Sequence, residues 1–143
     1  MNEFETYKSL FLSEHYTCLL FDEKKSVHSF QRGVAPLLDW IENAYIARGA
    51  SAIDKVVGKA AAYLYVLLKV KNVYAFVISQ PALEVFRDYG INVQYDTLVS
   101  MIRNRTDTGF CPMETAVRDC NSPEEAYLSI QAALKKMRSG PEA

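Results

Sequence analysis

The chain passes from a strand into a helix at Val73-Tyr74-Ala75-Phe76-Val77-Ile78-Ser79-Gln80-Pro81-Ala82. The apolar run over 73–78 has too little alternation for a strand with one wet face, so it predicts a strand in the interior of a sheet. Ser79 has a side chain suited to capping a helix, and Pro81 suits the first helical turn. Gly90 is a residue type that ends helices. We therefore expect a buried strand that leads directly into a helix ending at Gly90.

Upstream of this strand, the apolar residues between Ala52 and Lys69 repeat with a period of 3.6, which is typical of a helix. Beyond Ala60 the opposite side of this segment is apolar too. A helix that is apolar on all sides lies inside a domain, so the sequence predicts Ala52–Lys69 as the most buried helix. The residues that set the period are Ile53, Val56, Val57, Ala60, Ala61, Leu64, Leu67 and Leu68.

Local patterns predict the remaining elements around this strand and helix. In chain order we expect a helix from Phe4 to Phe11, a hairpin of strands over 16–21 and 26–30, a helix opening at Pro36, a short strand over 91–95, a loop over 104–109, a helical turn after Cys111, and a last helix capped by Ser122-Pro123-Glu124-Glu125. The mixture of strands and helices indicates an α/β domain with a mixed sheet.

Composition narrows the class of protein. The chain has 143 residues, half of them hydrophobic, which suits a single domain over 1–143 with a packed core. The formal net charge of −1 gives no basic surface for nucleic acid. No apolar run is long enough to span a bilayer, and the N-terminus lacks the pattern of a signal peptide, so we expect a cytoplasmic protein without a membrane partner. Three cysteines at irregular spacing do not indicate a disulfide framework.

The order of the expected elements resembles that of the cytidine deaminase-like superfamily, which implies a three-layer α/β/α sandwich with a mixed central sheet. The chain also contains two motifs, Asp54-Lys55-Val56-Val57-Gly58-Lys59-Ala60-Ala61-Ala62 and Asn104-Arg105-x-x-x-x-Phe110-Cys111-Pro112-Met113-Glu114. Through these motifs it resembles more closely an uncharacterised family of that superfamily, a domain of unknown function. The family has no established reaction, so the resemblance implies a fold more than an activity.

The chain departs from the zinc-dependent deaminases at both halves of their metal site. Those enzymes open one helix with Pro-Cys-x-x-Cys and place His-x-Glu or Cys-x-Glu at the start of the buried helix. Here Ala82 and Val85 stand in place of the two cysteines, and 57–61 contains no His, Cys or Glu. A four-coordinate zinc site needs such ligands. We therefore expect no bound metal, no cofactor and no cytidine deaminase activity.

The first motif contains four candidate ligand-binding residues. Asp54 is a candidate for holding a substrate group or for positioning Lys59, although the Ser51-x-x-Asp54 spacing favours a capping box that needs no ligand. Lys55 and Lys59 are spaced one helical turn apart, and a cation near a helix N-terminus opposes the helix dipole. That placement favours binding of an anion, against the alternative of solvated lysines. Gly58 permits close approach of a ligand or of a neighbouring sheet.

The second motif contributes a loop and a thiol. Asn104 and Arg105 lie on a polar segment where Arg105 is either a phosphate-binding group or an exposed loop arginine. Cys111 at a helix start would have a lowered thiol pKa and could act as a nucleophile, with Glu114 or Lys59 as the proton acceptor. The favoured alternative is a buried structural cysteine, with Glu114 completing a helix cap.

Two classes of function follow from these residues. The first is a zinc-independent domain that binds a small anionic, nucleotide-like ligand, with catalysis by Lys59, Cys111 and Glu114 left open; the nucleotide-like character comes from the superfamily resemblance alone. Its site would lie at the start of the buried helix, beside the 104–114 segment. The alternative is a non-catalytic interaction or regulatory module. The nine tyrosines of the chain would suit such a surface, including a homodimer interface.

Overall fold

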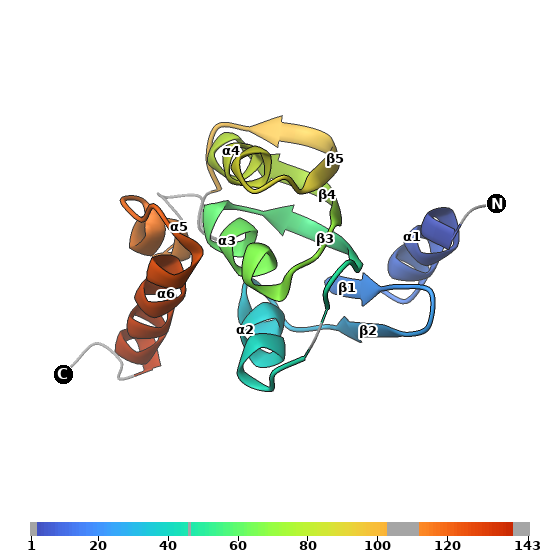
Figure 1. Ribbon diagram of the computed structural model, residues 1–143, viewed down its shortest axis with the longest axis horizontal. Coiled ribbons are helices and arrows are strands. Elements are labelled where there is room, and N and C mark those ends of the chain that lie inside the picture. Colours follow the sequence, from blue (N-terminus) through green and yellow to red (C-terminus); the bar gives the residue numbers. More distant parts are fainter. Residues whose placement is uncertain (1–2, 46, 103–111, 139–143) are drawn as a thin grey trace.

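The computed structural model describes residues 3–45, 47–102 and 112–138. The chain forms a five-stranded sheet with strand order β2-β1-β3-β4-β5. Figure 1 shows helices on both faces of this sheet. The elements are α1 (Glu3–Ser13), β1 (Cys18–Phe21), β2 (Ser26–Ser29), α2 (Ala35–Glu42), β3 (Ser51–Val57), α3 (Lys59–Leu68), β4 (Asn72–Ser79), α4 (Gln80–Asp88), β5 (Asn92–Val99), α5 (Pro112–Val117) and α6 (Pro123–Arg138).

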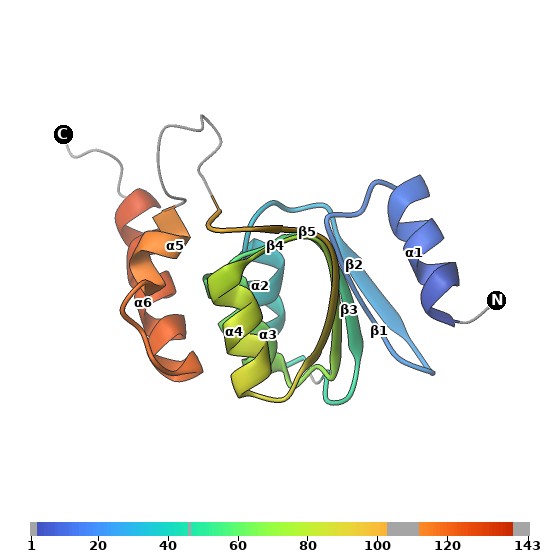
Figure 2. The same ribbon diagram turned by 90° about the horizontal axis from the view of Figure 1, so that it is seen from above.

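The sheet is mixed, as the sequence predicts. Strand β1 pairs antiparallel with both β2 and β3, whereas β3, β4 and β5 are parallel. The two parallel crossovers step in the same direction across the sheet, so α3 and α4 lie on the same face. Figure 2 shows α2, α3 and α4 against that face, α5 and α6 outside them, and α1 alone on the opposite face. In the part of the chain that the structure describes, no helix has the length and apolar character that crossing a membrane would require.

The prediction of one long helix over Ala52–Lys69 is wrong in its first half. Ser51–Val57 is the central strand β3, and α3 begins only at Lys59. The apolar residues Ile53, Val56 and Val57 fit a helical period, but a strand covered on both faces is also a nearly continuous apolar run. Pairing with β1 on one side and β4 on the other makes this segment a strand. The second half is confirmed, because seven of the ten residues of α3 are buried.

The strand-to-helix passage at β4 and α4 is confirmed in detail. Strand β4 lies between β3 and β5, and the Ser79 hydroxyl accepts a hydrogen bond of 3.2 Å from the Ala82 amide. Gly90, with φ of +72°, lies just past the end of α4. Ala82 and Val85, which stand in place of the zinc ligands, are buried in the hydrophobic core. The following strand runs over Asn92–Val99, further than the expected 91–95.

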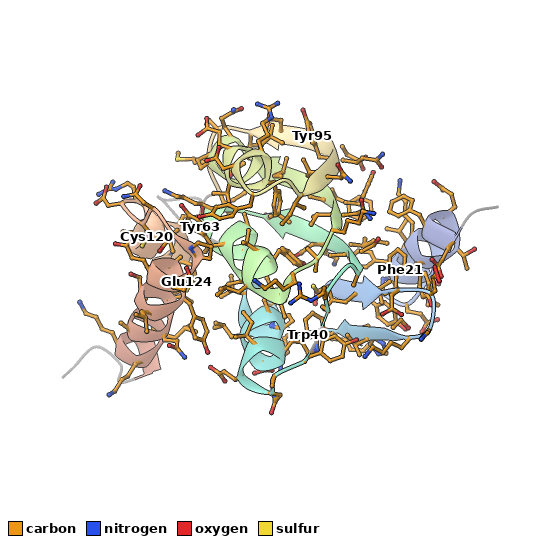
Figure 3. All side chains as sticks on the ribbon, viewed as in Figure 1. Phe21, Trp40, Tyr63, Tyr95, Cys120 and Glu124 are labelled. Atoms are coloured by element: carbon orange, nitrogen blue, oxygen red, sulfur yellow. The ribbon has the colours of Figure 1, made fainter. Side chains whose placement is uncertain are left out.

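Each face of the sheet has its own core. The larger core packs the sheet against α2, α3, α4, α5 and α6. The smaller core is largely aromatic and lies under α1, beside Phe21 (labelled in Figure 3). The ring of Tyr7 on α1 stacks on Phe21 with centroids 4.2 Å apart. The segment between α5 and α6 is joined to α3 through Tyr63, whose hydroxyl donates to the Cys120 carbonyl at 3.1 Å. The Ser122 hydroxyl accepts from the Glu125 amide, so the expected cap of α6 is confirmed.

Candidate functional site

A cleft of about 390 Å³ opens where β3 ends and α3 begins. Its walls come from the loop after β2, the second half of β3, the first turn of α3, and the start of α5. The cleft therefore lies beside the carboxyl end of a parallel strand, the edge at which open α/β sheets bind ligands. Asp54, Lys55, Gly58 and Glu114 of the sequence-predicted site all line it.

Asp54 is a buried carboxyl group in the middle of the sheet. Because its segment is a strand, the predicted capping box with Ser51 does not form. The Asp54 side chain is only 7% exposed, and its Oδ2 accepts a hydrogen bond of 2.6 Å from the hydroxyl of Tyr65 on α3. Burial raises the pKa of Asp54 to about 7, against the opposing effect of hydrogen bonds from Tyr65, Val56 and Lys55.

Cys18 on β1 contacts the same Tyr65 hydroxyl that donates to Asp54. It is the register partner of Asp54 on β1, and its Sγ lies 3.0 Å from the Tyr65 hydroxyl oxygen. Burial and the neighbouring Asp54 charge raise the pKa of the Cys18 thiol well above its ordinary value. The same two causes raise the pKa of the Tyr65 phenol. Both groups therefore keep their protons at neutral pH, and the three side chains form a hydrogen-bonded row that ends at the cleft.

Glu114 caps α3 from another helix. Its Oε1 accepts from the Lys59 amide at 2.8 Å, and its Oε2 accepts from the Ala60 amide at 3.1 Å. Gly58 is the N-cap residue and offers no side chain of its own. A Cβ at Gly58 would overlap the Glu114 carboxylate, with Oε1 at 2.8 Å. Burial raises the pKa of Glu114, and the two amides and Lys59 oppose that rise.

The two lysines do not share a helix face, contrary to the prediction. Lys55 is an exposed residue of β3, whereas Lys59 is the first residue of α3. The Lys59 ammonium donates to the Arg118 carbonyl at 3.0 Å, just past the end of α5. A carbonyl at a helix C-terminus attracts a cation, which accounts for a lysine at the start of α3 despite the dipole of α3 itself. The Lys59 side chain is not among the groups that line the cleft.

The other sequence-predicted residues, Asn104, Arg105 and Cys111, lie outside the described residues. The structure adds two residues that the sequence analysis missed. Arg32, in the loop after β2, lines the cleft, and Tyr65 holds Asp54. The buried position of Tyr65 could have been anticipated, because a tyrosine in a helix that is apolar on all sides needs a partner for its hydroxyl. Within residues 3–45, 47–102 and 112–138, no three His, Cys, Asp or Glu side chains gather as a metal site.

Comparison with known proteins agrees with this architecture. The chain is similar to the crystal structure of a DUF1893 family protein (TM1506) from Thermotoga maritima, with a TM-score of 0.83 and 27% sequence identity. The match covers 95% of this chain and 92% of that chain. A search of the curated proteins finds no match. The family described as a domain of unknown function (DUF1893) matches residues 6–134. Because this match spans most of the sequence, the chain belongs to the DUF1893 family.

Proposed function

We propose that the cleft beside β3 binds a small ligand through an anionic group such as phosphate or carboxylate. The observation that carries this proposal is a pair of exposed cations, Arg32 and Lys55, on the wall of the cleft. Across the described ranges, neither side chain forms a hydrogen bond or an ion pair with another residue. Cationic side chains beside a concave site attract an anion, and the guanidinium of Arg32 offers a forked donor set to it.

The rest of the cleft suits the body of a small molecule. A volume of about 390 Å³ lies within the range of small-molecule sites, and Val34, Ala61 and Met113 supply apolar wall. A ligand with a flat or apolar ring and a charged group would contact both parts of this surface. These features support the nucleotide-like ligand that the sequence analysis suggests, and a sugar phosphate or carboxylate has the same charged group.

We further propose that the fold is a zinc-free form of the cytidine deaminase-like sandwich. The support is the order of hairpin, parallel strands and crossover helices, together with the starts of α3 and α4 beside the sheet edge. Where zinc deaminases place metal ligands at the start of α4, this chain has the core residues Ala82 and Val85. At the start of α3, the Glu114 carboxylate accepts hydrogen bonds from the first amides of the helix.

The chemical roles expected for Lys59 and Glu114 change in this proposal. Both Glu114 oxygens accept amide hydrogen bonds, and the Lys59 ammonium is bound to the Arg118 carbonyl. We assign anion binding to Arg32 and Lys55 instead. The nucleophilic role of Cys111 and the ligand contacts of Asn104 and Arg105 remain predictions from the sequence.

Calorimetric titration tests the proposal with three probes: inorganic phosphate, adenosine 5′-monophosphate and adenosine. We expect the phosphate-bearing probes to bind and adenosine to bind more weakly. Arg32→Ala and Lys55→Ala should each weaken binding by about tenfold or more, since a hydrogen bond to a charged group contributes about 1.5–3 kcal/mol. Lys24→Ala is the matched control, because Lys24 is an exposed lysine of the β1–β2 turn, outside the cleft. Equal losses in all three variants, or no binding of any phosphate, would contradict the proposal.

The alternative of an interaction module is favoured by one observation, the exposed apolar side chains at the two edges of the sheet. Phe30, which follows β2, is 59% exposed, and Tyr95 and Leu98 of β5 are 39% and 41% exposed. We propose the β5 edge, with Tyr95 and Leu98, as a second candidate site, at which a second copy of the chain would bind. Light scattering after size-exclusion chromatography tests it: a dimer that Leu98→Lys converts to monomer supports it, and a monomeric wild-type protein excludes it.

A further inference from the structure

Asp54 and Glu114 both line the cleft and both accept hydrogen bonds from backbone amides, but Asp54 also accepts from a side-chain hydroxyl. Glu114 accepts from two backbone amides, donors that cannot reverse, so its contacts favour only the ionised carboxylate. Asp54 Oδ2 accepts from the Tyr65 hydroxyl at 2.6 Å, and that oxygen lies 3.0 Å from the Cys18 thiol. A hydroxyl and a thiol each donate or accept, so the hydrogen bonds of this row can run in either direction.

The row keeps every member hydrogen-bonded in both charge states of Asp54. With Asp54 ionised, the Cys18 thiol donates to Tyr65 and the Tyr65 hydroxyl donates to the carboxylate. With Asp54 protonated on the same oxygen, the carboxyl group donates to Tyr65, and Tyr65 donates to the Cys18 sulfur. Among the described residues, no buried side-chain nitrogen or oxygen lacks a partner. A buried carboxyl group that can gain or lose its proton without leaving an unpaired neighbour is suited to proton transfer.

We infer that the cleft catalyses proton transfer to or from its ligand, with Asp54 as the group that exchanges the proton and with Tyr65 and Cys18 as positioning residues. This inference rests on the proposed function, because the bound anion would bring the reacting atom beside Asp54. In the forward step a ligand X–H bond breaks, the proton passes to the Asp54 carboxylate, and the electron pair stays on the ligand. The proton then returns to another ligand atom, which gives an isomerisation that needs no oxidant, reductant or co-reactant.

The charges around Asp54 are compatible with this role. Its partners on β1 and α3 are the neutral Cys18 and Tyr65, and its register partner on β4 is Ala75. The charged groups that share the cleft are Arg32, Lys55 and Glu114. In the structure as described, no cation forms an ion pair with Asp54, so burial dominates and its pKa of about 7 lies close to neutral pH. A general base or acid works best when its pKa is near the working pH.

Carbon-13 NMR of protein labelled at the aspartate carboxyl carbons tests the row without any ligand. We expect a titration midpoint near 7 for Asp54, assigned by its loss in Asp54→Asn. Tyr65→Phe removes the donor to the carboxylate and should raise the proton affinity of Asp54 by about tenfold, one pKa unit. Cys18→Ser preserves a group that donates and accepts, so it should leave the midpoint within about 0.3 unit. Cys18→Ala removes the group that accepts from Tyr65 in one charge state and donates to it in the other, so it should shift the midpoint by more than Cys18→Ser does.

The outcomes separate this inference from the proposed function. A wild-type midpoint below about 5, an ordinary value for aspartate, or an unchanged midpoint in Tyr65→Phe would overturn the role of the row even if phosphate binds. If the NMR midpoints are as predicted but no phosphate probe binds in calorimetry, the role of the row stands and the proposed anion site is wrong. Circular dichroism confirms folding of each variant. If Tyr65→Phe does not fold, the comparison of Cys18→Ser with Cys18→Ala decides, and equal midpoints in those two would overturn the row.

Discussion

The cap that Glu114 places on α3 makes Gly58 a position where a single methyl group should matter. Gly58 has φ of −102°, a conformation open to any residue, so Gly58→Ala introduces no backbone strain. Its new Cβ would instead overlap the Glu114 carboxylate and displace it from the Lys59 and Ala60 amides. The cost is therefore the loss of a charged helix cap.

The size of the effect follows from the two amide hydrogen bonds that the methyl group would break. Removing a side-chain cap costs about 0.5–2 kcal/mol, and a hydrogen bond to a charged group contributes about 1.5–3 kcal/mol. Replacing Gly by Ala also stabilises the folded state by about 0.4–1 kcal/mol, because alanine restricts the unfolded chain. We expect Gly58→Ala to lower the free energy of unfolding by about 2 kcal/mol, measured by urea denaturation. Glu114→Ala should cost a similar amount.

The double variant Gly58→Ala/Glu114→Ala distinguishes this mechanism from general damage. Without the carboxylate the Cβ at position 58 has room, so the double variant should be no less stable than Glu114→Ala alone. Costs that add, as for distant and independent sites, would refute the cap mechanism. Glu84→Ala serves as control, because Glu84 is an exposed carboxylate on α4 and its loss should change stability by less than about 0.5 kcal/mol.

Four further expectations follow from the structure. The raised pKa of Asp54 means that the folded state binds its proton more tightly than the unfolded state, so this group should make stability fall as pH rises from about 4 to about 7. Asp54→Asn should remove that fall, which is at most about 4 kcal/mol for three pKa units, in urea titrations at several pH values. Lys59→Ala should lose the hydrogen bond to the Arg118 carbonyl but leave phosphate affinity unchanged in calorimetry; a loss of binding free energy above about 1 kcal/mol would restore the sequence-based role of Lys59 in ligand binding. Ser79→Ala should destabilise the protein by about 1 kcal/mol in thermal unfolding, since it removes the cap of α4. Elemental analysis should find well under one zinc per chain. Stoichiometric zinc would refute the inference that a chain with Ala82 and Val85 in place of the two cysteines holds no zinc.

Elements fixed by contacts between sequence neighbours could be predicted from the sequence, and elements fixed by distant pairing could not. Ser79, Pro81 and Gly90 act on their own neighbours, so the passage from β4 to α4 was predicted correctly. Over 51–57 the apolar residues satisfy two periods at once. The choice between helix and strand there is made by pairing with β1 and β4, which no local pattern contains.

The candidate site shows the same limit. Asp54, Lys55, Gly58 and Glu114 were selected through the family resemblance, and the structure brings them to one cleft. Their contacts were not predictable, because Glu114 meets the start of α3 across 55 positions of sequence. Arg32 was missed for the same reason: the strand order β2-β1-β3 brings the loop after β2 to the cleft.

The central claim, an anion-binding cleft at the end of β3, is tested most directly by amide NMR during titration with adenosine 5′-monophosphate. We expect saturable shifts confined to the amides of 31–34, 54–58 and 61, the backbone that surrounds the cleft. Arg32→Ala should reduce these shifts at the same nucleotide concentration. Saturable shifts confined instead to the separate cleft between α1 and the starts of β4 and β5, or no shifts at all, would contradict the claim.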